Sequence, residues 1–140
     1  MDLIYKEEFY KIKKACIIVR RKLGNGFLEK VYENALSIEL KKLGFIIELQ
    51  KELLVYYDDK IIGKYYADIV VDNKTIIELK TCERITKIHK LQILNYLKAT
   101  GYKLGIIINF PNESIGFEIE RVPNFINRVS TNQTNNYSNI

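Results

Sequence analysis

The sequence has few of the residues that mark specialised folds. Its 140 residues include two cysteines, two prolines, one histidine and no tryptophan. The cysteines, Cys16 and Cys82, form no C-x-x-C pair, which argues against a zinc site and against a disulfide scaffold. We therefore expect both to be small buried residues of a cytoplasmic protein. A long apolar run and a signal-peptide layout are also lacking, so we expect no membrane partner.

The overall composition is that of an ordinary globular domain. Apolar residues make up 47% and charged residues 28% of the chain, and this balance excludes collagen-like and disordered chains. The 22 Lys and Arg residues against 17 Asp and Glu residues give a net charge of +5, which is compatible with a polyanionic partner without requiring one. We expect one domain over residues 1–129 and a disordered polar tail over 130–140. The sequence contains no nucleotide-binding loop, so we expect no nucleotide cofactor.

The hydrophobic periodicity predicts an α/β fold, in which helices flank a central mixed sheet. Steps of three and four predict helices over about 7–23, 28–43 and 86–100. Alternation and β-branched residues predict strands over about 45–57, 62–71, 75–80, 104–110 and 116–122. The expected element order is therefore α-α-β-β-β-α-β-β.

Charged side chains interrupt two neighbouring, nearly continuously apolar strands. Asp68 lies in one strand, and Glu78 and Lys80 lie in the next. Isolated charges in buried strands are costly unless they are paired or bind a metal. A hairpin centred on Asn73 places Asp68 opposite Glu78, with Cβ atoms roughly 5 Å apart, and Lys80 on the face of Glu78. Two such carboxylates predict a seat for a hard divalent cation.

Two alternatives stay open for these charges. Lys80 could neutralise Asp68 or Glu78 in a structural ion pair. A register shift of one residue would instead place Asp68 on the other face of the sheet.

The second predicted helix carries a glutamate on its apolar side. Four residues lie within about an 80° arc of this helix: Glu29, Glu33, Leu36 and Leu40. Glu29 therefore opens a stripe that otherwise faces the core. The alternative is a first-turn glutamate that stabilises the helix dipole.

The third predicted helix carries a polar stripe that could line a cleft. Its members lie within about 60° of one another: His89, Gln92 and Tyr96. The side expected to face the core is formed by Leu91, Leu94 and Leu97. An ordinary solvated face is the alternative.

Together these features resemble the PD-(D/E)xK nuclease superfamily. Asp68, nine intervening residues and Glu78-Leu79-Lys80 match its Asp…Glu-x-Lys signature. The span from Gln92 to Tyr96 matches the Gln-x-x-x-Tyr element of its RecB-like and lambda-exonuclease-like branch. The sequence Gly26-Phe27-Leu28-Glu29-Lys30-Val31-Tyr32 is similar to the namesake motif of the small GxxExxY proteins. Ala67 stands where proline is common, and Arg20 stands where we expect a histidine in that family.

The resemblance implies a restriction endonuclease-like core and a role for each matching residue. Asp68, Glu78 and the Leu79 carbonyl would bind Mg²⁺ or Mn²⁺, and Glu29 would reach the metal directly or through water. Lys80 would orient and help to deprotonate the attacking water. The two remaining residues, Gln92 and Tyr96, would position the water or the scissile phosphate.

The implied activity is metal-dependent hydrolysis of DNA, by an exonuclease or a structure-specific endonuclease. A homodimer or a partner protein would help a chain this short to act on two strands. A weaker expectation is that a set of basic residues contacts DNA: Lys11, Lys14, Arg20, Arg21 and His89. The alternative is a solvated basic face without a ligand.

Two other functions compete with the enzyme. One is a non-catalytic module that keeps the nuclease fold and binds DNA or a protein, and the other is a small α/β protein with structural ion pairs alone. A degenerate module is expected to lose an acid or the lysine. The complete set favours the enzyme: Glu29, Asp68, Glu78, Lys80, Gln92 and Tyr96.

Overall fold

The computed structural model describes residues 3–125, and it contains the elements in the predicted order. They are α1 (Lys6–Leu23), α2 (Glu29–Lys42), β1 (Ile47–Tyr57), β2 (Lys60–Val71), β3 (Thr75–Lys80), α3 (Lys87–Thr100), β4 (Leu104–Asn109) and β5 (Glu118–Pro123). The strands form one mixed sheet in the order β1-β2-β3-β4-β5, and only β3 and β4 pair in parallel. The predicted tail, 130–140, lies outside the described residues. Over residues 3–125, no helix has the length and apolarity needed to cross a bilayer.

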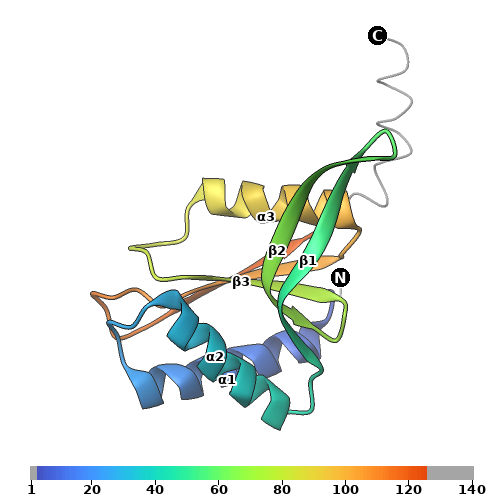
Figure 1. Cartoon of the computed structure of the whole chain (residues 1–140). Helices are drawn as coiled ribbons and strands as arrows, with labels where there is room; N and C mark the ends of the chain where they lie inside the picture. The colour runs from blue at the N-terminus through green and yellow to red at the C-terminus, as the bar shows by residue number, and fades with distance from the viewer. Residues whose placement is uncertain (1–2, 126–140) are drawn as a thin grey trace.

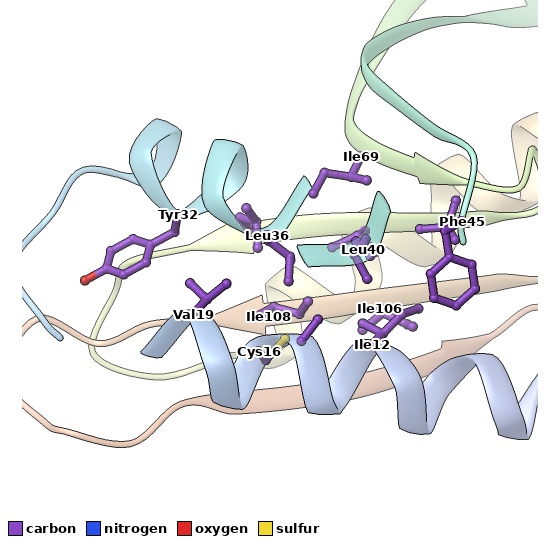
Figure 2. Packing of buried hydrophobic residues seen from close by; sticks show 14 of the residues in the cluster. Ile12, Cys16, Val19, Tyr32, Leu36, Leu40, Phe45, Ile69, Ile106 and Ile108 are labelled. Atoms are coloured by element: carbon purple, nitrogen blue, oxygen red, sulfur yellow. The ribbon is translucent and has the colours of Figure 1, made fainter. Parts of the chain in front are cut away.

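Helices cover both faces of the sheet, with α1 and α2 on one side and α3 on the other (Figure 1). On the first side, α1 and α2 pack against β3 and β4 through one buried apolar cluster. Figure 2 shows Ile12, Cys16 and Val19 of α1 meeting residues of α2 and of the sheet. These positions recur every three or four residues, so burial of one stripe anchors α1.

On the other face, α3 packs through a narrower contact. Its buried residues are Ile93 and Leu97, and they lie over Gly105 of β4. A Cβ atom on residue 105 would come within 2.6 Å of Ile93 Cδ1, so glycine permits this close approach. The prediction that Leu91 faces the core is wrong, because its side chain is 56% exposed. The true inner side of α3 is rotated toward its polar stripe.

The predicted register of the β2–β3 hairpin is confirmed where the two strands pair. Val71 is paired with Thr75, Val70 with Ile76 and Ile69 with Ile77. The pairing ends at Ile69, although β2 continues and stays paired with β1. The β1–β2 hairpin therefore separates from β3, and its far end projects beyond the body of the protein (Figure 1).

The separation coincides with a change of face in β2. Ile69 packs in the α1/α2 cluster, whereas Ala67 packs in the α3 cluster. In a regular strand these two residues would point to the same face. Asp68 thus sits at an irregular point, where β2 bends away from β3.

The cysteine prediction is half correct. Cys16 is fully buried, whereas Cys82 is partly exposed. Cys82 lies two residues beyond Lys80, the last residue of β3, and its backbone N–H donates to the Asn109 side chain. It lies beyond the end of the sheet, where no layer of side chains covers it completely.

Candidate active site at the β2–β3 fork

Asp68 is fixed through both carboxylate oxygens. Its Oδ2 accepts a hydrogen bond of 2.8 Å from the backbone N–H of Leu79, and its Oδ1 accepts one of 3.1 Å from Gln50 Nε2. The Leu79 N–H is available to Asp68 because ladder pairing between β2 and β3 has already ended at Ile69 and Ile77. The fork in the sheet therefore ties Asp68 to the strand that carries Glu78.

Glu78 lies half-buried beside Asp68 and accepts a hydrogen bond from the Tyr65 hydroxyl. Burial, followed by the negative charge of Asp68, raises the pKa of Glu78 to about 8 from an ordinary 4.5. The Tyr65 hydrogen bond and Lys80 act in the opposite direction. Asp68 is therefore close enough to Glu78 for its negative charge to disfavour the charged form of Glu78.

Lys80 shares the surroundings of Glu78 without being held by an anion. Among residues 3–125 its ammonium makes no hydrogen bond, and no carboxylate oxygen comes within 4.0 Å of it. The alternative of a structural ion pair with Asp68 or Glu78 is therefore wrong for this structure. A half-buried lysine with free donors can hold a water or a phosphate oxygen.

Helix α3 brings its polar stripe against Glu78 and Lys80. The stripe and the two strand residues enclose a hollow of about 70 Å³, which we call the α3-side hollow. Its lining consists of Tyr65, Glu78, Lys80, His89, Gln92, Ile93, Tyr96 and Ile107. The Tyr96 ring stacks on Tyr65, with centroids 3.8 Å apart and planes 8° apart. Tyr96 thus supports the tyrosine that donates to Glu78. Gln92 is exposed at the rim.

The histidine of this stripe also has a structural task. Thr86 caps α3 by accepting a hydrogen bond from the His89 N–H, and His89 Nδ1 accepts from the Thr86 N–H in return. This reciprocal cap satisfies two backbone donors at the start of the helix. Only the Nε2 edge of His89 is left for a ligand in the hollow.

A second hollow lies on the α2 side of Asp68. It measures about 210 Å³, and we call it the α2-side hollow; Glu29, Lys30, Glu33, Gln50, Asp68 and Leu79 line it. Glu29 is exposed at its edge, whereas Glu33, one turn further along α2, is only 3% exposed. The six predicted residues are thus divided between the two hollows: Glu29 and Asp68 line the α2-side hollow, whereas Glu78, Lys80, Gln92 and Tyr96 line the α3-side hollow.

The local sequence explains why Glu29 stands at the start of α2. Gly26 adopts φ 101°, a conformation that favours glycine. Tyr32 is fully buried, and its hydroxyl donates to the Gly24 carbonyl over 2.7 Å. The spacing Gly-x-x-Glu-x-x-Tyr therefore combines a turn, a site residue and the buried anchor that holds the turn in place.

One of the predicted DNA contacts is wrong. Arg20 is 6% exposed, and its guanidinium donates to the carbonyls of Pro111 and Ser114 and to Tyr32 Oη. Arg20 is buried because it closes the loop before β5 against the end of α1. The other helix residues of that set, Lys11, Lys14 and Arg21, are exposed and line neither hollow.

The donor set suits a hard divalent cation. Over the described residues, no group of three or more His, Cys, Asp or Glu side chains is placed to hold a metal. Two carboxylates are nevertheless adjacent, half-buried and without a cationic partner within 4.0 Å. Mg²⁺ characteristically takes one or two carboxylates and retains several waters, so Asp68 and Glu78 fit such an ion.

Three residues of the site are missed by the sequence reasoning: Glu33, Gln50 and Tyr65. Glu33 falls in the same helical arc as Glu29, so its periodicity could have indicated it. Tyr65 precedes the bend at Asp68, where the two-residue alternation fails. Gln50 carries no sequence signal, because its place opposite Asp68 depends on the β1–β2 register.

A comparison with protein families identifies the class of the protein. The model of the PD-(D/E)XK nuclease superfamily matches residues 6–122. The chain therefore belongs to that superfamily, and its α/β sheet is a restriction endonuclease-like core. A comparison with curated proteins finds no match.

Two solved structures share the fold. The alkaline exonuclease LHK-Exo from Laribacter hongkongensis has 12% identity and a TM-score of 0.54, over 96% of this chain and 77% of that one. The protein SSO0001 has 20% identity and a TM-score of 0.53, over 86% of this chain. This chain spans 60% of the length of SSO0001.

Proposed function

We propose that this protein is a metal-dependent deoxyribonuclease that hydrolyses phosphodiester bonds, as an exonuclease or a structure-specific endonuclease. The observation that carries the proposal is the fork between β2 and β3. Asp68 and Glu78 lie side by side there, and Lys80 beside them is bound to no carboxylate within 4.0 Å among the described residues. A chain that used these charges only for stability would be expected to pair the lysine with an acid.

In this proposal each residue keeps one task. Asp68 and Glu78, with the Leu79 carbonyl, hold Mg²⁺ or Mn²⁺, and Glu29 approaches the ion from the α2-side hollow. A bound divalent cation supplies Lewis-acid charge beside the scissile phosphate. Lys80 orients the attacking water and stabilises the negative charge that develops on the phosphate oxygens.

The α3 residues act around Glu78. Tyr65 donates a hydrogen bond to one Glu78 oxygen and so orients the carboxylate. Tyr96 supports Tyr65 by stacking on its ring. Gln92 lines the rim of the α3-side hollow, and in this proposal it contacts the water or the phosphate. The expected products are a 5′-phosphate and a 3′-hydroxyl.

The proposal is tested with labelled single-stranded, nicked, branched and duplex DNA, with Mg²⁺, Mn²⁺ or EDTA. We expect cleavage that requires the metal and falls at least about 100-fold in Asp68→Asn and in Lys80→Ala, as when charge-stabilising groups are removed from other active sites. The matched controls are Asp59→Asn and Lys60→Ala, at the exposed tip of the β1–β2 hairpin. Both controls should cleave like the wild type.

The other outcomes separate the alternatives. Equal cleavage by all variants would identify a contaminating nuclease. DNA binding without metal-dependent cleavage by any form would contradict the enzyme and support a non-catalytic module.

A further inference from the structure

Gln50 has a backbone conformation that its strand does not explain. It lies between the pairs Leu49–Ile69 and Lys51–Ala67 of the β1–β2 ladder, directly opposite Asp68. Its φ is 50°, in the left-handed region. Residues with a β-carbon are strained there, and glycine or asparagine adopts this region more easily. Strain of this kind tends to persist at functional sites.

The side chain of Gln50 uses this conformation to join two acids. Its Nε2 donates over 2.7 Å to Glu33 Oε1 and over 3.1 Å to Asp68 Oδ1. A carboxamide nitrogen has two hydrogens, so it can serve both oxygens at once. The opposite orientation of the amide would direct its oxygen at two carboxylates, so the pair of acids fixes the orientation.

Glu33 provides a firm attachment for this bridge. It is 3% exposed, and Gln50 is the hydrogen-bond donor to its Oε1. Its Oε2 lies 2.6 Å from the Lys30 ammonium but has no hydrogen bond of good geometry within the described residues. Lys30 and Gln50 are both exposed, so Glu33 is the buried member of this group of three.

We propose that Gln50 is a positioning residue for Asp68, held in place by Glu33. With the Leu79 N–H on Oδ2 and Gln50 on Oδ1, the Asp68 carboxylate is locked before any cation arrives. Each oxygen keeps a second lone pair for a ligand. The inference rests on the proposed metal-dependent function, because a locked carboxylate is useful where it must present oxygen to an ion.

Two substitutions separate positioning from stability. Gln50→Met keeps the length and the backbone strain but removes the amide, whereas Gln50→Gly removes the amide and relieves the strain. We expect the glycine variant of the metal-free protein to melt at a higher temperature than the methionine variant. We nevertheless expect both to need about 10- to 100-fold more Mn²⁺ for half-maximal cleavage, the range found for outer-shell partners of metal ligands.

The DNA concentration for half-maximal rate should not change, because Gln50 acts on the acid and not on the DNA. Direct Mn²⁺ titration of each protein gives a readout that does not depend on cleavage. Asp59→Gly is the matched control, since Asp59 has φ 63° in the exposed hairpin turn. It should raise the melting temperature without altering Mn²⁺ affinity.

The outcomes distinguish this inference from the proposed function. If cleavage by the two Gln50 variants followed their melting temperatures, with Mn²⁺ affinity unchanged, Gln50 would be structural and the inference would be overturned. If the wild type neither cleaved DNA nor bound Mn²⁺, the proposed function would fail and this inference with it. Weaker Mn²⁺ binding by both variants would support the inference independently of the cleavage assay.

Discussion

The α1/α2 face of the sheet and the α3 face bury their side chains to different extents. Of the residues described, sixteen form the buried cluster between α1, α2 and the sheet, and eight form the cluster beneath α3. The buried residues that α3 contributes to the smaller cluster are Ile93 and Leu97, and partly buried Leu94 packs against them. The rest of that inner surface is given to the polar groups around Glu78. The comparison shows that most of the apolar burial lies on one face, which leaves the other free to carry charge.

The largest expected effect comes from truncating one core residue on each face. We expect Ile12→Ala in α1 and Leu97→Ala in α3 each to reduce the free energy of unfolding by about 2–5 kcal/mol, since both are fully buried. Denaturant unfolding measures this loss. Assayed where both variants are fully folded, only Leu97→Ala should also slow cleavage, because α3 carries Gln92 and Tyr96. Equal slowing by Ile12→Ala would contradict the division between faces.

A second effect is a pH dependence specific to the α3 face. Burial and the charge of Asp68 raise the pKa of Glu78 to about 8 in the folded protein, from 4.5. Between pH 4.5 and 8, Glu78 is therefore protonated in the folded state and ionised in the unfolded state. The stability contributed by this proton is complete below pH 4.5 and is lost as pH rises through 8. We expect the free energy of unfolding of the metal-free protein to fall by up to a few kcal/mol over this range.

Glu78→Gln is the control for this pH dependence. The groups that face Glu78 are Tyr65, Asp68, Lys80 and His89, and all of them remain in the variant. A pH profile unchanged in Glu78→Gln would assign the dependence to another group.

A smaller effect is expected where α3 approaches the sheet most closely. In Gly105→Ala the new Cβ would lie 2.6 Å from Ile93 Cδ1 and 3.2 Å from Leu97 Cδ1, so the Ile93 side chain or α3 itself must move. We expect a loss of about 1–3 kcal/mol in unfolding free energy and slower cleavage. Gly63→Ala is the matched control in β2, since no atom would lie within 4 Å of its Cβ. Equal losses in both variants would show that α3 packing is not the cause.

The smallest effect is expected on the outer side of α1. Lys11→Ala combined with Lys14→Ala should change the unfolding free energy by less than about 0.5 kcal/mol, because both side chains are exposed. Cleavage and the salt dependence of DNA binding should also stay close to those of the wild type, as neither residue lines a hollow. A shallower slope of log affinity against log salt would show that α1 contacts the phosphates.

Much of the fold could be predicted because its signals are local. Helix stripes, turn residues and apolar strands specify the element order, and the short turn around Asn73 specifies which residues of β2 and β3 pair. The same register indicated that Asp68 and Glu78 are neighbours. These inferences need only the period of each element and the geometry of one hairpin.

Predictions failed where an outcome depended on packing between distant segments. Arg20 has the sequence context of a surface residue, yet it is buried because the loop around Pro111 and Ser114 offers carbonyl oxygens. Leu91 fits an apolar stripe, yet it is exposed, because the side of α3 that carries Ile93 and Leu97 packs against Gly105 instead. The loop that binds Arg20 and the glycine that α3 packs against are both far from these residues in the sequence, so no local pattern indicates them.

By itself, the sequence determined the order of helices and strands, the hairpin register and the identity of the paired carboxylates, because these follow from the backbone periods of neighbouring residues. The tertiary structure decided that β2 leaves β3 at Ile69, that Asp68 is held from two sides, and that Glu33, Gln50 and Tyr65 complete its surroundings. The physical reason is that hydrogen-bond partners and burial at the fork come from segments far apart in the chain. Their contacts exist only after the helices have packed on the sheet.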